Sequence, residues 1–216
     1  MTRSLLLDLD GTLVDSVPDL AAALNRLMRT RGLAEFTHAE TALMVGDGVA
    51  RLIERAFAAR GRTPDAGAIA EYSADYLTHA AVQTRPYPGV VEGLQALSGD
   101  GWKLAVCTNK PEAAARSLLA ALGLATYFAA IGGGDSFPVR KPDPGHLLAT
   151  LNAAGGASSC AVMAGDHAND VAAARGAGVR CIFAGWGYGP PAMADGAVAV
   201  AGDFAELVSI AQRLLG

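Results

Sequence analysis

The stretch Leu5-Leu6-Leu7-Asp8-Leu9-Asp10-Gly11-Thr12 decides the fold, because an apolar run of strand length ends there in two aspartates one residue apart. Strand residues two apart point to the same face, so we expect both carboxylates to emerge together where a buried strand ends. Two like charges this close repel each other unless a cation or a proton lies between them, which indicates a ligand site. The alternative is an ordinary Asp10-Gly11 turn, with Asp8 incidental beside it.

Further apolar runs of strand length follow, separated by segments with helical patterning. We expect strands over residues 5–9, 104–108, 161–165 and 181–184, and a weaker one over 128–131. Strands that are buried on both faces of a parallel sheet read as continuous apolar runs, and these do. The pattern therefore predicts an α/β fold with a doubly wound parallel sheet and a Rossmann-like core.

Residues 10–103 separate the first expected strand from the second, which is far more than a single crossover helix requires. Apolar residues recur within this segment at helical spacing and without strand-like alternation. We therefore predict an inserted, all-helical domain over residues 15–87. Residues 1–14 and 88–216 would form the Rossmann-like core.

The composition limits the classes of function. The chain has 216 residues, of which 51% are hydrophobic, and a net charge of −4. A nucleic-acid partner is not expected, because that needs a clustered basic excess. Membrane insertion is not expected either, because no apolar run approaches the ~20 residues of a membrane span. We expect a cytoplasmic protein, either a monomer or a homodimer, whose partner is a small molecule.

Polar residues also follow the later expected strands. Ligands of open parallel sheets bind outside the carboxyl ends of the strands, so these residues are candidates for a site. Thr108 and Asn109 end the second strand, where they could hold phosphate oxygens or simply cap the next helix. Asp166 and Asp170 follow the third strand. One of them could bind a metal ion while the other supports it. Alternatively, both are only acidic residues at the start of a helix, where they interact favourably with the helix dipole.

Lys141 is a cation followed by two prolines in the stiff loop Arg140-Lys141-Pro142-Asp143-Pro144. A lone loop lysine is usually only solvated. Here it is one of three lysines in a chain that otherwise uses arginine, which favours a required point charge. Taken together, the strand ends predict a phosphate site with Mg²⁺ held by Asp8, Asp10 and Asp166, and with Asp170 supporting it.

These motifs resemble, in order and spacing, the four motifs of the haloacid dehalogenase superfamily. The resemblance covers essentially the whole chain, including a helical cap after the first motif. Three further stretches look most like its phosphoglycolate phosphatase branch: Tyr87-Pro88-Gly89-Val90, Ile131-Gly132-Gly133-Gly134-Asp135 and Gly185-Trp186-Gly187-Tyr188-Gly189.

The resemblance implies a Mg²⁺-dependent phosphatase that hydrolyses a small phosphate monoester through an aspartyl-phosphate intermediate. Asp8 would attack phosphorus, and Asp10 would protonate the leaving oxygen and then activate water. The phosphoryl oxygens would be held by the remaining motif residues, namely Gly11, Thr108, Asn109 and the catalytic Lys141.

The expected substrate is 2-phosphoglycolate. A sugar phosphate, a nucleotide or pyrophosphate remain alternatives. A related phosphomutase is disfavoured because Leu20 stands where such enzymes carry a histidine, although His38 and His79 leave it open. A phosphonate hydrolase is excluded, because it needs a cap lysine and residues 15–83 contain none. A non-catalytic member would be expected to have lost the nucleophile or the metal ligands.

Substrate recognition is expected from the cap. Gly48 and Arg51 are the candidates, because the Arg51 guanidinium could bind a substrate carboxylate through two hydrogen bonds. Arg55 lies one helical turn further on and could join it. The alternative is a solvated polar face in which Arg51 pairs with Glu54.

Overall fold

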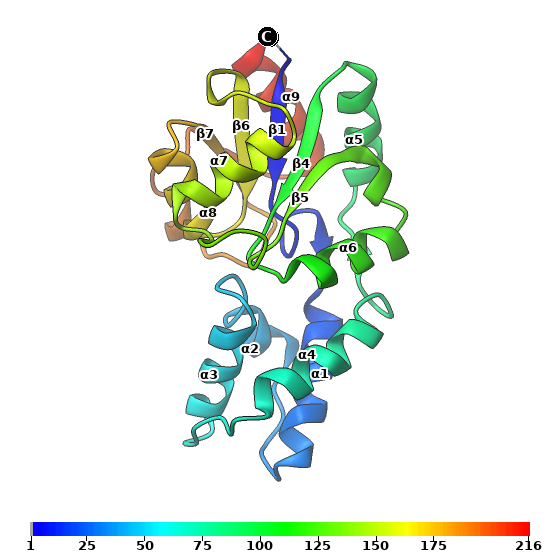
Figure 1. The fold of residues 1–216 in the computed structure, drawn as a ribbon, viewed down its shortest axis with the longest axis vertical. Coiled ribbons are helices and arrows are strands. Elements are labelled where there is room, and N and C mark those ends of the chain that lie inside the picture. The colour runs from blue at the N-terminus through cyan, green and yellow to red at the C-terminus, as the bar shows by residue number, and fades with distance from the viewer. Residues whose placement is uncertain (1) are drawn as a thin grey trace.

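The computed structural model describes residues 2–216, and a parallel six-stranded sheet forms the centre of the molecule. The strand order is β5-β4-β1-β6-β7-β8, and every neighbouring pair is parallel (Figure 1). The bounds are β1 Ser4–Leu7, β4 Lys103–Cys107, β5 Phe128–Gly132, β6 Ala161–Gly165, β7 Arg180–Ala184 and β8 Ala199–Ala201. The prediction of an α/β, doubly wound parallel sheet is confirmed.

Two details of the strand prediction were wrong. The first strand ends at Leu7 and not at residue 9, because the chain turns directly after Asp8. The edge strand β8 was missed, because it has only three residues and Val200 within it is exposed, so it lacks the continuous apolar run of a buried strand.

Helices cover both faces of the sheet, and the alternating side chains of β1 show why. Leu5 and Leu7 pack into one hydrophobic cluster, whereas Leu6 packs into another on the opposite face. Helices α5 (Val90–Gly99), α6 (Glu112–Ala121) and α9 (Phe204–Leu215) complete the first cluster, and helices α7 (Pro144–Ala153) and α8 (Ala168–Gly176) complete the second.

Four helices lie beyond the ends of the strands, at the bottom of Figure 1. They are α1 (Val17–Thr30), α2 (His38–Ala42), α3 (Val49–Ala59) and α4 (Ala68–His79). Their apolar faces form a hydrophobic cluster that takes almost all of its members from these helices and the loops between them. The structure contains the helices predicted for this segment, although its two ends form short strands, and the domain limits at residues 14 and 88 stay a prediction.

Both connections to these helices lie side by side. Strand β2 (Val14–Asp15) pairs antiparallel with β3 (Arg85–Pro86). Asp19 strengthens the junction, because its buried carboxylate accepts hydrogen bonds from the backbone N–H of Gln83 and Thr84 and from the Thr84 hydroxyl at 2.7 to 3.0 Å. The paired connections fix the four helices over the carboxyl edge of the sheet.

His146 gives the fold an expected pH dependence. This fully buried histidine contacts the Gly133 carbonyl oxygen through Nε2 at 3.0 Å, and burial together with the Lys141 charge lowers its pKa from 6.5 to about 4. The unfolded chain then binds more protons than the folded one between these two values. The contribution of His146 to stability should be complete above pH 6.5 and should fall by about 3 kcal/mol on acidification to pH 4.

Urea unfolding at a series of pH values checks this expectation, with His146→Gln as the comparison. Glutamine retains a hydrogen-bond donor for Gly133 but does not titrate. The difference in unfolding free energy between the two proteins should therefore shrink as the pH falls from 7 to 4. A constant difference over that range would show that His146 is not kept neutral by the fold.

Candidate active site

The loop after β1 places Asp8 and Asp10 at the carboxyl edge of the sheet. Asp8 still donates its N–H to the Ala164 carbonyl oxygen at 2.9 Å, and then the chain turns, with Gly11 N–H bonded to the Val14 carbonyl oxygen at 2.9 Å. Gly11 adopts φ +84°, and a Cβ there would lie 2.3 Å from Oδ2 of Asp166. Only glycine fits this turn, since both its conformation and the space require it.

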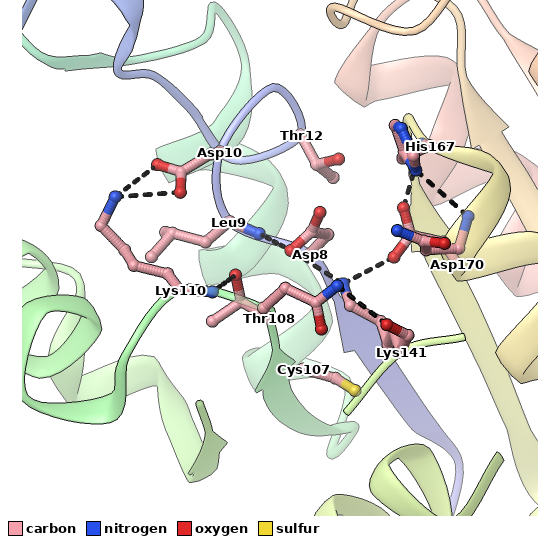
Figure 2. A network of polar contacts seen from close by, with 12 residues as sticks. Asp8, Leu9, Asp10, Thr12, Cys107, Thr108, Lys110, Lys141, His167 and Asp170 are labelled. Carbon is pink, nitrogen blue, oxygen red and sulfur yellow. Dashed lines mark hydrogen bonds and ion pairs between the residues drawn. The ribbon is translucent and has the colours of Figure 1, made fainter. Parts of the chain in front are cut away.

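Each of the two aspartates has a lysine of its own, as Figure 2 shows. Lys141 Nζ lies 2.9 Å from Oδ1 of Asp8, and Lys110 Nζ lies 2.9 Å from both oxygens of Asp10. The Ser16 hydroxyl also donates to Asp10, at 2.6 Å. Each carboxylate therefore forms its own buried ion pair, and a cation shared by Asp8 and Asp10 stays a prediction.

Asp170 joins Asp8 through the same lysine. Lys141 Nζ lies 2.6 Å from Oδ1 of Asp170, and the His167 N–H donates to its other oxygen at 3.0 Å. Burial opposes the charge on Lys141, but Asp170 and Asp8 outweigh it and raise the lysine pKa above its ordinary value. The loop lysine is accordingly an anchored charge at the bottom of the site and not a solvated one.

Asp166 completes a group of three buried carboxylates with Asp8 and Asp170, whose oxygen atoms lie within 4.8 Å of one another. Thr12 Oγ1 donates to one Asp166 oxygen at 3.0 Å and the Tyr188 N–H donates to the other at 2.8 Å. Burial, together with the charges of Asp8 and Asp170, raises the pKa of Asp166 to about 7.

Oxygen ligands and concentrated negative charge fit a small hard cation such as Mg²⁺. A cation among these three carboxylates would offset the repulsion that raises the pKa of Asp166. The grouping differs from the predicted ligand set, because it contains Asp170 and not the carboxylate of Asp10, which faces Lys110. Asp8 and Asp166 remain the predicted ligands, and Asp170 is close enough to ligate as well as to support.

The glycine-rich segment 185–189 has a clear structural role. A Cβ at Gly187 would lie 2.3 Å from the Asp166 Cβ, and one at Gly189 would lie 1.9 Å from its backbone oxygen. Tyr188 between them bonds Asp166 through its N–H and Asp15 through its hydroxyl, at 2.9 Å. The segment therefore wraps Asp166 and ties it to the start of the cap helices.

The predicted phosphate-binding residues are buried at the same edge, but they are not equally available. Thr108 accepts the Lys110 N–H at 3.2 Å, and within residues 2–216 its hydroxyl donates no hydrogen bond, so it could donate to an oxyanion. The Asn109 side-chain amide already donates to the carbonyl oxygens of Gly46, at 3.0 Å, and Lys141, at 2.9 Å. The N–H of Gly11 is likewise used, by Val14. Asn109 thus links the cap loop to the loop that carries Lys141.

A cavity of about 180 Å³ opens between the sheet edge and the cap helices. Asp8, Asp10 and Thr108 line it on the core side. Most of the remaining wall is apolar or aromatic and comes from the cap and from helix α6: Leu20, Val45, Val49, Leu52, Tyr72, Tyr76, Leu77, Pro111, Ala113 and Ala114. The space suits a small ester whose phosphoryl group reaches Asp8.

The two cap predictions differ in outcome. Gly48 lines the cavity, and its φ of +86° and its closeness to the Asn109 carbonyl oxygen allow the loop to approach the core. Arg51 lies outside the cavity, is largely exposed and pairs with Glu54 at 2.7 Å. Arg55 pairs with Asp47. The structure therefore does not bring the Arg51 guanidinium to a substrate in this cavity, because its helix turns that face to solvent.

Sequence reasoning missed the residues that position the carboxylates: Thr12, Ser16, Lys110 and Tyr188. One signal was available for Lys110, because the rarity of lysine in the chain applies to it as much as to Lys141. Thr12 and Ser16 lie in or next to the motif that begins at Asp8, but the sequence does not show their roles, because their partners are set by how the loop after β1 folds.

The sheet, the cap and the acidic group agree with what the comparisons find. A family model for haloacid dehalogenase-like hydrolases matches residues 2–178, and the chain belongs to this family. The predicted superfamily resemblance is confirmed.

Several curated relatives are phosphoglycolate phosphatases. The chain is 45% identical to the one from Agrobacterium fabrum over 185 residues, covering 84% of this chain and 79% of the relative. It is 42% identical to the one from Rhodospirillum rubrum over 216 residues, covering 96% of this chain and 90% of the relative. A crystal structure of a predicted phosphoglycolate phosphatase from Haemophilus somnus superposes with a TM-score of 0.89 at 29% identity, covering 97% of each chain.

Proposed function

We propose that this protein is a Mg²⁺-dependent phosphatase that hydrolyses 2-phosphoglycolate through an aspartyl-phosphate intermediate. The observation that supports this most strongly is the position of Asp8, which borders the cavity, is paired with Lys141 and belongs to the group of three carboxylates. The names of the relatives, and their identity over most of the chain, favour this substrate.

Asp8 is suited to attack phosphorus. The Leu9 N–H at 2.7 Å and Lys141 at 2.9 Å both bind its Oδ1, which holds the carboxylate in one orientation and leaves Oδ2 as the attacking atom. Attack forms the bond from Oδ2 to phosphorus and breaks the bond from phosphorus to the leaving oxygen. Lys141 and the Thr108 hydroxyl stabilise the negative charge on the phosphoryl oxygens.

Asp10 would move protons in this mechanism. It borders the same cavity two residues after the nucleophile, and it is held by Lys110 and Ser16. It would donate a proton to the leaving oxygen and later accept one from the water that hydrolyses the aspartyl-phosphate. Water attack at phosphorus then releases phosphate and restores the Asp8 carboxylate.

Asp8, Asp166 and Asp170 would hold the Mg²⁺ ion. Bound there, the ion would supply positive charge to the phosphoryl oxygens. The chain itself contributes the ligand carboxylates and fixes them, through Thr12 and Tyr188 on Asp166 and through Lys141 and His167 on Asp170.

The phosphomutase alternative has little support. A mutase needs a further acid and base near the bound sugar, and neither His38 nor His79 is among the residues that line the cavity. His79 instead contacts the Asp75 carbonyl oxygen on its own helix at 2.8 Å. A phosphatase for another small phosphorylated acid shares every feature of the core and is the second candidate.

Hydrolysis of a panel of phosphorylated metabolites tests the proposal. Release of phosphate should be highest from 2-phosphoglycolate by kcat/KM, should vanish with EDTA and should return with excess Mg²⁺. Mg²⁺ alone should also raise the Tm, because it binds the three buried carboxylates only in the folded state. A Tm and an activity that do not respond to EDTA or Mg²⁺ would refute the metal assignment, and a sugar phosphate or nucleotide as best substrate would refute 2-phosphoglycolate.

A further inference from the structure

Lys110 is a buried cation that the proposed chemistry does not fully use. Its side chain is 4% exposed, and Nζ contacts both oxygens of Asp10. The ammonium group also lies 4.5 Å from the centre of the Tyr76 ring, in cation–π geometry. An ammonium has three N–H donors, so the two bonds to Asp10 leave a third donor for another acceptor.

Among the residues that line the cavity, Lys110 is the only cation. Arg51 and Arg55 of the cap are outside its wall, and each already pairs with a carboxylate of the cap. The aliphatic and aromatic surroundings strengthen any charge interaction made in this space, because they lower the local dielectric constant. A second anionic group on the substrate, besides the phosphoryl group at Asp8, could therefore pair only with Lys110 among the residues that line the cavity.

Two buried hydroxyl groups in the same wall point to an acceptor. Tyr72 and Tyr76 lie one turn apart on α4, with ring centroids 6.0 Å apart and nearly parallel planes. Both side chains are almost fully buried, and within residues 2–216 neither hydroxyl has a hydrogen-bond partner. A buried hydroxyl without a partner is destabilising, so two on one wall of a cavity suggest donors kept for a ligand.

We propose that Lys110, Tyr72 and Tyr76 form a subsite for a carboxylate on the leaving group. The subsite selects phosphate esters of small hydroxy acids over esters that lack a carboxylate. This inference rests on the proposed function for the place of the phosphoryl group at Asp8, and it explains how 2-phosphoglycolate would be chosen.

The distances support the assignment. Asp10 has to touch the leaving oxygen in order to protonate it, and Lys110 Nζ lies 2.9 Å from Asp10. In the phosphate ester of a 2-hydroxy acid, the carboxylate carbon is two bonds from that leaving oxygen. A carboxylate so close to Asp10 reaches Lys110 before it could reach the cap arginines, which lie outside the cavity.

The experiment compares 2-phosphoglycolate with ethyl phosphate, which has the same phosphoryl group and a methyl group in place of the carboxylate. The readout is the ratio of the two kcat/KM values. Wild type should favour 2-phosphoglycolate, and Lys110→Met should reduce the ratio at least about 30-fold, because a charge-assisted hydrogen bond is lost. Tyr72→Phe and Tyr76→Phe, which each remove only a hydroxyl, should each reduce the ratio about threefold to tenfold.

Lys103→Met is the matched control. Lys103 starts the same strand that Lys110 follows, but it lies at the opposite end and donates to the Gly155 carbonyl oxygen at 2.7 Å. It should leave the ratio unchanged. If Lys110→Met slows both esters equally and keeps the ratio, Lys110 only supports Asp10 and the subsite is refuted.

Binding to the Asp8→Asn protein separates the subsite from turnover. Calorimetry measures the Kd of each ester. Adding Lys110→Met to this variant should weaken the binding of 2-phosphoglycolate at least about tenfold and should change the binding of ethyl phosphate little. Absence of turnover of any ester by wild type would refute the proposed function, and this binding comparison would still decide the subsite. Equal weakening of both ligands, or an unchanged ratio in both tyrosine variants, would overturn the carboxylate assignment.

Discussion

Replacing Asp8 by asparagine should reduce kcat by at least about 10⁴-fold, because the amide cannot attack phosphorus to form the covalent intermediate. The fold should survive. Asparagine has the same shape, its Oδ1 can still accept the Leu9 N–H, and Lys141 keeps Asp170 as an ionic partner. We expect the Tm to move by no more than about 5 °C.

Steady-state release of phosphate measures the loss of kcat, and thermal unfolding measures the change in Tm. Asp195→Asn is a suitable control, since it makes the same chemical change at an exposed aspartate in a loop near the C-terminus. Substantial turnover by the Asp8→Asn protein would remove Asp8 as the nucleophile. A labelled phosphoryl group trapped on a different residue would do so as well.

Replacing Lys141 by methionine should lower both stability and activity. The side chain is 1% exposed and pairs with Asp8 at 2.9 Å and Asp170 at 2.6 Å, so its loss leaves two buried carboxylates without their cation. Breaking a buried ion pair from one side costs about 3–5 kcal/mol. The phosphoryl oxygens also lose a positive charge, which should lower kcat at least about 10³-fold.

A second substitution distinguishes the structural effect of Lys141 from the catalytic one. In the Lys141→Met, Asp170→Asn double variant, one uncompensated carboxylate is gone, so the free energy of unfolding should recover in part. The activity should not recover, because the charge on the phosphoryl oxygens is still missing. Urea unfolding and kcat report the two effects. An active, fully stable Lys141→Met protein would show that this lysine is neither a structural nor a catalytic charge.

The positions of the site residues could be predicted because the sheet carries strong local signals. Parallel strands appear as apolar runs, and their carboxyl ends meet at one edge, so Asp8, Thr108 and Asp166 had to lie near one another. The short edge strand β8 had no such signal, since its side chains are only partly buried.

The pairing of side chains could not be predicted. Lys110 and Asp10 are separated by 100 residues, and Lys141 and Asp170 by 29, so each pair depends on how several segments pack. The direction of Arg51 was equally undetermined. Its spacing from Arg55 shows that the two arginines share one face of α3. Only the packing of α3 shows that Arg51 lies away from the cavity.

The sequence by itself determined the parallel α/β sheet, the helical insertion and the candidate site residues at the strand ends, because hydrophobic periodicity and motif order are local properties of the chain. The tertiary structure decided which lysine neutralises which aspartate, that Asp170 stands with Asp8 and Asp166, and that Lys110 is the only cation among the residues lining the cavity. The physical reason is that charge pairing and burial act over a few ångströms between segments remote in sequence, and only folding sets those distances.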